Sequence, residues 1–193
     1  MLKKIVNFLF EMEHLRFTPR SGWQRLGIRD PQNVAEHSAI APMIAFVLAV
    51  MEGHKNPCHC ATITLFHDGR EQRTQDQNAV SKRYNKTDEV CAGKDIAYPL
   101  GKVGEALLTV QSEFDEKLTK ASKIAHDADR LEMMFEARRL MSIGYADAEK
   151  FFLSGFVGME TESGKQIAEE LRDADPNDWW KNISSVVHTE PKV

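Results

Sequence analysis

The chain has 193 residues, of which 42% are hydrophobic, and this is enough material for one domain with its own core. Its formal charge of -4 at pH 7 excludes a general attraction to nucleic acid or to an anionic membrane surface, so any charge that binds an anion must be local. The three cysteines, Cys58, Cys60 and Cys91, are too few for a disulfide framework and are typical of a reducing compartment. We therefore expect a cytoplasmic protein with no nucleic-acid partner.

Two apolar runs raise the question of a membrane segment. The first, Ile5 to Phe10, is interrupted by Glu11 and is too short for the core of a signal peptide. The second, Ile40 to Met51, contains Pro42 and is too short to cross a bilayer, so it indicates a buried core helix. We expect no membrane partner.

The spacing of apolar residues predicts an all-α fold, because no segment shows sustained two-residue alternation. Residues 16–33 read as an irregular loop and residues 70–97 as a polar region that is helical in parts. Helices are predicted, in chain order, from Leu2 to before Pro19, from Val34 to Glu52, from near Pro57 to an end at His67-Asp68-Gly69, over 101–112, from Leu118 to Met141, and once or twice within 146–172.

No boundary divides residues 1–172, which we expect to form a single domain. The pair Asp175-Pro176 marks a C-terminal tail, taken as 173–193. The tail contains Trp179 and Trp180, which we expect to dock onto the body or onto a second subunit.

Three positions combine histidine and aspartate in helical context. His37 lies in the first turns of a predicted helix, His67-Asp68 ends an apolar helix, and Asp129 lies near the edge of the buried face of another. A carboxylate there is costly unless it is paired or coordinates a metal ion. Taken alone, His37 is also typical of a surface or capping residue, and a second dipeptide, His126-Asp127, is a candidate decoy. Spacing alone does not select among these readings.

Several separate motifs accompany these residues. Arg20-Ser21-Gly22-Trp23 places its tryptophan fourteen residues before His37, and Asp76 follows the His-Asp pair. The remaining motifs are Asn33-Val34-Ala35-Glu36-His37, His67-Asp68-Gly69-Arg70-Glu71, and Asp129 followed by Arg130-Leu131-Glu132-Met133. Together they resemble the HD-domain superfamily of helical metal-dependent phosphohydrolases, and most closely its 5'-deoxynucleotidase branch. The resemblance covers about residues 8–141.

This resemblance implies a single HD-domain helical bundle that works as a homodimer and hydrolyses (deoxy)ribonucleoside 5'-monophosphates to nucleoside and phosphate. It implies one divalent metal ion, held by His37, His67, Asp68 and Asp129. Two imidazoles and two carboxylates suit Mn, Co, Fe, Ni or Zn better than Mg.

The resemblance also gives roles to the residues around the ion. Glu71 would be the catalytic carboxylate, and it would orient or deprotonate the attacking water or protonate the leaving oxygen. Arg20 would pair with phosphate, Trp23 would lie against the sugar or base, and Asp76 would accept a hydrogen bond from a sugar hydroxyl. The alternatives are a surface charge for Arg20 and a loop anchor that packs on the core for Trp23.

Two features bear on the substrate. The segment 70–86 contains two acidic residues and five basic ones, which are Arg70, Arg73, Lys82, Arg83 and Lys86. This excess of positive charge suits a phosphate, although a solvated helix face would have the same composition. Gln75 stands where the family often has the glycine before its aspartate, and glycine there permits backbone conformations that glutamine resists. A phosphodiesterase acting on a cyclic or signalling nucleotide, and a non-catalytic module that binds metal or nucleotide, therefore stay open.

Overall fold

The computed structural model describes residues 1–187, and this part of the chain is helical, with no strand beyond one isolated bridge between Pro19 and Asn33. The predicted all-α fold is confirmed. The helices are α1 (Leu2–Glu13), α2 (Ser21–Gln24), α3 (Val34–Met51), α4 (Pro57–Phe66), α5 (Glu71–Thr74), α6 (Ala79–Tyr84), α7 (Glu89–Ala97), α8 (Lys102–Glu116), α9 (Lys120–Ser142), α10 (Glu149–Gly155), α11 (Glu162–Leu171) and α12 (Asp178–Val187). Three short 3-10 segments join them, at His14–Phe17, Tyr98–Leu100 and Ala146–Ala148.

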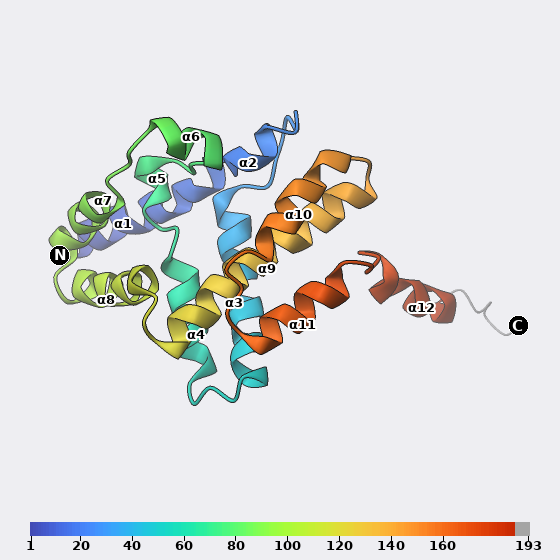
Figure 1. The fold of residues 1–193 in the computed structure, drawn as a ribbon. Helices are drawn as coiled ribbons and strands as arrows, with labels where there is room; N and C mark the ends of the chain where they lie inside the picture. The colour runs from blue at the N-terminus through green and yellow to red at the C-terminus, as the bar shows by residue number, and fades with distance from the viewer. Residues whose placement is uncertain (188–193) are drawn as a thin grey trace, which may run out of the picture.

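Helix α9 is the centre of the bundle and packs against α3, α4, α10 and α11 (Figure 1). Its apolar residues recur at helical spacing, and Ile124, Ala128 and Leu131 are fully buried. The alanines let the neighbouring helices approach closely, while leucine and isoleucine fill the space between them. The main core therefore lies around α9, and the interior side chains of α3 and α4 meet there.

Helix α3 begins at a capping box. The Asn33 side chain accepts from the Glu36 amide at 3.0 Å, and the Glu36 carboxylate accepts from the Asn33 amide at 2.9 Å. This start point places His37 in the first turn with its side chain fully buried. By length and hydropathy alone α3 would be able to cross a membrane. It nevertheless packs against α4 and α9 along one side, as a core helix does.

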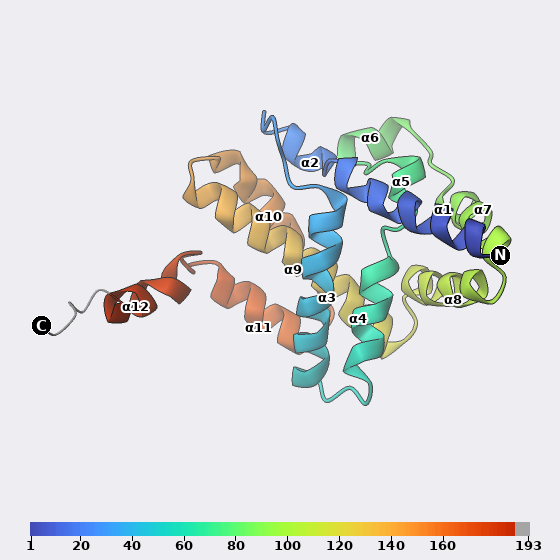
Figure 2. The same ribbon diagram turned by 180° about the vertical axis from the view of Figure 1, so that it is seen from behind.

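A smaller apolar cluster joins α1 to α7 and α8, on the side of the molecule opposite α12 (Figure 2). Its buried members are Phe8, Ile96, Leu100 and Leu107. The short helices α5 and α6 lie above this layer, inside the region predicted to be only partly helical.

The C-terminal tail forms α12, which projects away from the bundle (Figures 1 and 2). Trp179 is 75% exposed and Trp180 is 42% exposed. The expected docking of these tryptophans onto the body is therefore not seen within residues 1–187, and docking onto a second subunit stays a prediction.

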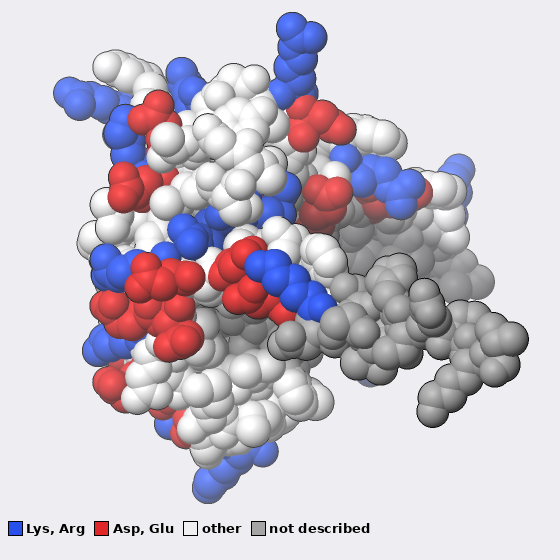
Figure 3. Space-filling view, turned by 90° about the vertical axis from the view of Figure 1, so that its right-hand side faces the viewer, with Lys and Arg blue, Asp and Glu red and all other residues white. Residues whose placement is uncertain are grey.

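The face of the molecule turned toward α12 carries Lys and Arg interspersed with Asp and Glu (Figure 3). Among the described residues on this face, acidic side chains gather in places, with Lys and Arg beside them.

Candidate active site

Helices α3, α4 and α9 bring together the four residues predicted to hold a metal ion. The Nε2 atoms of His37 and His67 lie 3.4 Å apart, and Asp129 Oδ1 lies 3.2 and 3.7 Å from them. One ligand atom from each of these three residues falls within 4.8 Å of the other two, so the group can hold a metal ion. Asp68 borders the same point, with one oxygen 3.5 Å from His37 Nε2 and the other 3.2 Å from His67 Nε2.

The far side of each imidazole tests whether the residues fit a metal. His67 Nδ1 donates to the backbone carbonyl of Thr64 at 2.6 Å, and His37 Nδ1 contacts Glu132 Oε2 at 2.5 Å. A ring that carries its proton on Nδ1 presents a lone pair at Nε2, and both Nε2 atoms face the cluster. This arrangement of outer partners is typical of metal-binding histidines. The donor set therefore fits a divalent ion.

The cluster also concentrates negative charge in a buried place. Burial would lower the pKa of His67, yet Asp68 and Asp129 outweigh it and raise that pKa well above its ordinary value. Burial would raise the pKa of Asp129, yet His37 and His67 bring it well below its ordinary range. The two carboxylates thus hold charge that protons on the imidazoles, or a cation between them, can neutralise.

Glu71 begins helix α5, one turn after Asp68, and its amide donates to the Asp68 carbonyl at 2.9 Å. Burial, together with the charges of Asp68 and Asp76, raises the pKa of Glu71 to about 9. One of its carboxylate oxygens is buried without a hydrogen-bond partner among the described residues. Because Glu71 also lines the cavity, its carboxyl group can exchange a proton with a molecule bound there.

Arg20 and Asp76 form one unit beside the cluster. Arg20 Nη1 donates to Asp68 at 3.1 Å and to Asp76 at 3.3 Å, and burial does not prevent these carboxylates from raising its pKa. Asp76 also accepts from the Ser21 amide at 2.6 Å and from the Ser21 hydroxyl at 2.7 Å. Arg20 is therefore not a solvated surface charge, because it is held by two carboxylates at the cavity wall.

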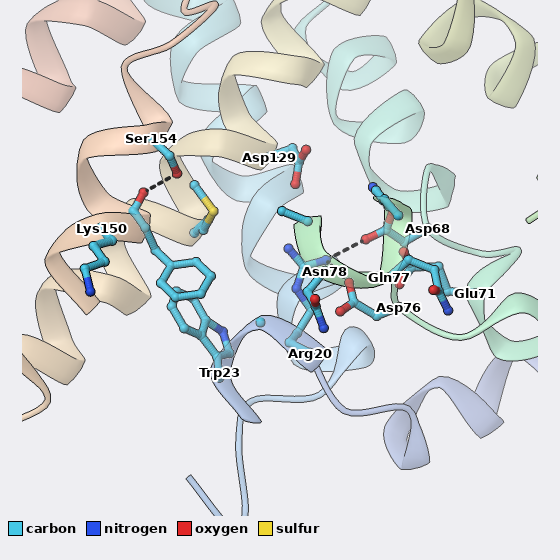
Figure 4. Close-up of a pocket in the computed structure, with 15 residues that line it drawn as sticks. Arg20, Trp23, Asp68, Glu71, Asp76, Gln77, Asn78, Asp129, Lys150 and Ser154 are labelled. Carbon is cyan, nitrogen blue, oxygen red and sulfur yellow. Dashed lines mark hydrogen bonds and ion pairs between the residues drawn. The ribbon is translucent and has the colours of Figure 1, made fainter. Parts of the chain in front are cut away.

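Trp23 lies between the core and the cavity, so it is placed both to anchor the loop on the core and to contact a molecule in the cavity. Its side chain is buried, and its ring packs on Phe151 with centroids 4.8 Å apart at an angle of 51°. It also lines a cavity of about 440 Å³ (Figure 4). In that view Trp23 and Lys150 lie at the opposite end from Asp68 and Glu71. The cavity thus has an aromatic end, with Lys150 beside it, and a more densely charged end around Asp68 and Glu71.

Some residues around this site had no role in the sequence analysis. Glu132 and Gln32 lie behind His37, although Glu132 belonged to the motif that begins at Asp129 and so was in view. The wall supplied by α10, with Lys150, Phe151 and Ser154, had no signal in the sequence.

The dipeptide His126-Asp127 lies outside the cluster, as expected of a decoy. His126 stacks on Phe114 with centroids 3.8 Å apart, and its Nε2 contacts the Phe114 carbonyl at 2.8 Å. Asp127 accepts from the amide and the hydroxyl of Thr161 at 2.6 and 2.7 Å. Both side chains hold the fold together.

The expected basic stretch of residues 70–86 is dispersed. Arg70 is buried and makes two 2.8 Å hydrogen bonds to Asp115, and Arg73 pairs with Glu11. Of the five basic residues, Lys82 lines the cavity. The basic residues that line the cavity are Arg20, Lys82 and Lys150, so its positive charge does not come from the whole stretch.

Comparisons with known proteins agree with this geometry. The family model described as HD domain matches residues 12–172. The chain is 28% identical over 162 residues to the 5'-deoxynucleotidase hdd1 of Schizosaccharomyces pombe, covering 78% of this chain and 80% of that protein. It is 23% identical over 140 residues to the 5'-deoxynucleotidase HDDC2 of Bos taurus, covering 70% and 67% of the two chains.

Solved structures show the same fold. The protein AF1432 of Archaeoglobus fulgidus is similar with a TM-score of 0.64 and 30% identity, covering 92% of this chain and 99% of that one. A conserved hypothetical protein of Pyrococcus furiosus gives a TM-score of 0.75 at 22% identity, covering 88% and 99%. From the match over residues 12–172 and the helical bundle that carries it, we conclude that this chain belongs to the HD domain family.

Proposed function

We propose that this protein is a metal-dependent phosphohydrolase that converts (deoxy)ribonucleoside 5'-monophosphates to nucleoside and phosphate. The observation that carries the proposal is the two-ended cavity, with the His-Asp cluster, Arg20 and Glu71 at one end and Trp23 at the other. A nucleotide has the same division between phosphate and base. The names of the relatives in fission yeast and cattle support the same class of substrate.

We propose that His37, His67, Asp68 and Asp129 hold one divalent ion. The mixed nitrogen and oxygen donors favour Mn, Co, Fe, Ni or Zn over Mg. When bound, such an ion supplies charge neutralisation at the phosphoryl oxygens and lowers the pKa of water.

The chain's own groups complete the charged end of the cavity. Both carboxylate contacts of Arg20 use Nη1, so its other nitrogens can donate to phosphate oxygens. Glu71 keeps the three roles expected of it, since its carboxyl group lines the cavity and could orient or deprotonate the attacking water or protonate the leaving 5'-oxygen. Positioning and charge neutralisation are the main requirements of phosphoryl transfer.

We propose that Trp23 packs against the sugar or base, with Phe151 behind its ring. Asp76 is assigned two tasks. It holds Arg20 and the start of α2, and it accepts from a sugar hydroxyl with a remaining lone pair, since a carboxylate has about four acceptor positions.

The test is phosphate release from a panel of deoxy- and ribonucleoside 5'-monophosphates, with cyclic and dinucleotide diesters alongside. Chelated protein is reloaded separately with Mn, Co, Ni, Zn or Mg. Wild type is compared with Asp68→Asn and Glu71→Gln, and with Asp173→Asn, an exposed aspartate far along the chain, as the matched control. We expect monoester hydrolysis that the first two substitutions abolish and the control retains.

Hydrolysis of diesters alone would replace the proposal with a phosphodiesterase. No turnover by protein that binds one ion would leave a binding module. The ratio of deoxy- to ribonucleotide turnover tests the assignment of Trp23 and Asp76 as sugar contacts.

We also propose a cytoplasmic homodimer, with residues 1–172 as the catalytic domain and 173–193 as an appended tail. The outer side of α3 supports the dimer. Six of its large apolar side chains are 44–62% exposed, and they are Ile40, Met43, Phe46, Val47, Val50 and Met51. This amounts to roughly 600 Å², the upper limit for a soluble monomer.

A second copy of the chain is the proposed occupant of this face. Helix α3 carries no charged residue after Glu36, so two copies can meet about a twofold axis without placing like charges together. A standard interface needs about 800 Å² from each partner, which this face and its rim approach. Light scattering of two variants tests the dimer. We expect Met43→Lys to be a monomer, and we expect the control Val157→Lys, at an exposed position elsewhere, to remain a dimer.

A further inference from the structure

We infer that Gln32 is a positioning residue that couples the aromatic end of the cavity to the metal-binding imidazole of His37. The inference rests on the proposed function for its substrate half and on contacts among this chain's own residues for its metal half. Neither the motifs nor the family resemblance assigned a role to this residue.

The backbone of Gln32 holds the segment that carries Arg20. Its carbonyl accepts from the Arg20 amide at 2.9 Å, and Val34 donates to the Thr18 carbonyl at 2.9 Å beside it. These two bonds flank the isolated bridge between Pro19 and Asn33. The residue before the capping box of α3 is thereby fixed against the residue expected to bind phosphate.

The side chain of Gln32 spans two groups with opposite requirements. Its Oε1 accepts from the indole nitrogen of Trp23 at 3.3 Å, and its Nε2 donates to Glu132 Oε1 at 2.5 Å. An indole N–H can only donate and an ionised carboxylate can only accept. The amide therefore has one satisfactory orientation, and each of its ends is committed to a different part of the site.

Glu132 carries the connection to the metal cluster. Its side chain is 4% exposed, and its second oxygen contacts His37 Nδ1 at 2.5 Å. The path thus runs from the indole to the amide, then to the carboxylate, the imidazole and the Nε2 atom that faces Asp129. Buried hydrogen bonds in such a chain reinforce one another, because the local dielectric is low.

This path has a consequence for function. Removing the amide leaves a buried oxygen of Glu132 without its donor, which frees the carboxylate to turn away from His37. Loss of the outer partner of a metal-binding histidine commonly lowers metal affinity by about ten- to a hundredfold. We therefore expect a substitution on the Trp23 side to be felt at the metal, and only through Gln32.

The experiment uses Gln32→Met, which keeps the length of the side chain but removes donor and acceptor, and Trp23→Phe, which removes the indole N–H but keeps an aromatic ring. The double variant completes the cycle. Gln24→Met, at an exposed glutamine at the end of α2, is the matched control. Co²⁺ is the probe: its affinity is measured by competition with a chelator, and its visible absorption reports the ligand geometry without substrate.

We expect Gln32→Met to weaken Co²⁺ binding by about tenfold, and Trp23→Phe by about threefold. In the double variant the second effect disappears, because its route is already cut. Co²⁺ affinity of Gln32→Met within about twofold of wild type, or effects that simply add, would overturn the inference. A loss of thermal stability with unchanged Co²⁺ affinity and unchanged spectrum would also overturn the inference.

Two further readouts keep the test decisive. If Gln32→Met does not fold, Trp23→Phe by itself decides the matter: an unchanged Co²⁺ affinity refutes the coupling, and a reduced one supports it. The affinity measurement needs no turnover, so a wild type that hydrolyses no nucleotide would defeat the proposed function without touching this result. Where turnover is present, Gln32→Met should lower kcat at saturating metal as well as raise KM, since both ends of the cavity are loosened.

Discussion

Gln75 adopts a backbone conformation that only glycine takes easily, with φ 62° and ψ 149°. The residue is exposed, and the next residue, Asp76, holds both Arg20 and Ser21. A side chain with a Cβ atom in this region costs about 1–3 kcal/mol. This backbone conformation directs Asp76 into the cavity wall, where its hydrogen bonds to Arg20 and Ser21 offset the cost.

Gln75→Gly should therefore stabilise the protein. Relief of about 2 kcal/mol of strain is offset by about 0.5–1 kcal/mol, because glycine has more freedom in the unfolded chain. The net gain is about 1 kcal/mol, which corresponds to a rise in Tm of about 2–4 °C for a chain of this size. Urea unfolding followed by circular dichroism, with unchanged m-values, measures the gain directly.

Two controls separate strain from other effects. Gln75→Ala keeps the Cβ atom and should gain nothing. Lys117→Gly changes the other described non-glycine residue of positive φ, which lies in the ordinary left-handed region at φ 56° and ψ 24°. The strain there is smaller and is nearly cancelled by the greater freedom of glycine in the unfolded chain, so we expect little change in stability. If Gln75→Gly is neutral, or if Gln75→Ala stabilises equally, the argument from backbone strain is refuted.

Three other perturbations follow from contacts at and near the site. Asp127→Ala removes the acceptor of the Thr161 amide and hydroxyl, so unfolding measurements should show a loss of about 3 kcal/mol, and a loss under 1 kcal/mol would contradict the structural role. Burial lowers the pKa of His126, so its contribution to stability is present above the ordinary histidine pKa and is lost as the pH falls from there through the lowered value in the folded protein. The difference in Tm between wild type and His126→Gln, scanned downward from pH 7, should therefore change in favour of the variant; a flat difference would exclude the effect. Chelation should lower the Tm of wild type by several degrees, while Asp68→Ala should respond little, and equal responses would show that the ion binds elsewhere.

The helices, and the inward positions of the residues predicted to be ligands, could be anticipated because their signals are local. The capping box at Asn33 and Glu36 sets the start of α3, and apolar spacing sets the course of α9, so His37 and Asp129 fall on inward faces. The aromatic wall could not be anticipated, because Phe151 meets Trp23 only after the chain has folded.

The partners of charged and polar side chains were predicted less well than the positions of apolar ones. The basic character of 70–86 suggested a single anion-binding region, yet Arg70 is committed to Asp115, 45 residues away in the chain. The same holds for Gln32, whose partner Glu132 lies 100 residues away. A hydrogen-bond partner at that separation leaves no mark on the sequence near either residue.

The residues of the cluster lie on α3, on α9 and directly after α4, and these three helices also pack extensively against one another. An ion bound there would tie distant parts of the folded chain together, and because the unfolded chain does not hold the four residues in place, the free energy of binding would add to the stability of the fold. The three cysteines are all free, so the chain has no disulfide to serve this purpose. Resistance to proteolysis should therefore depend on metal supply, and cells short of the metal would lose the protein itself as well as its activity.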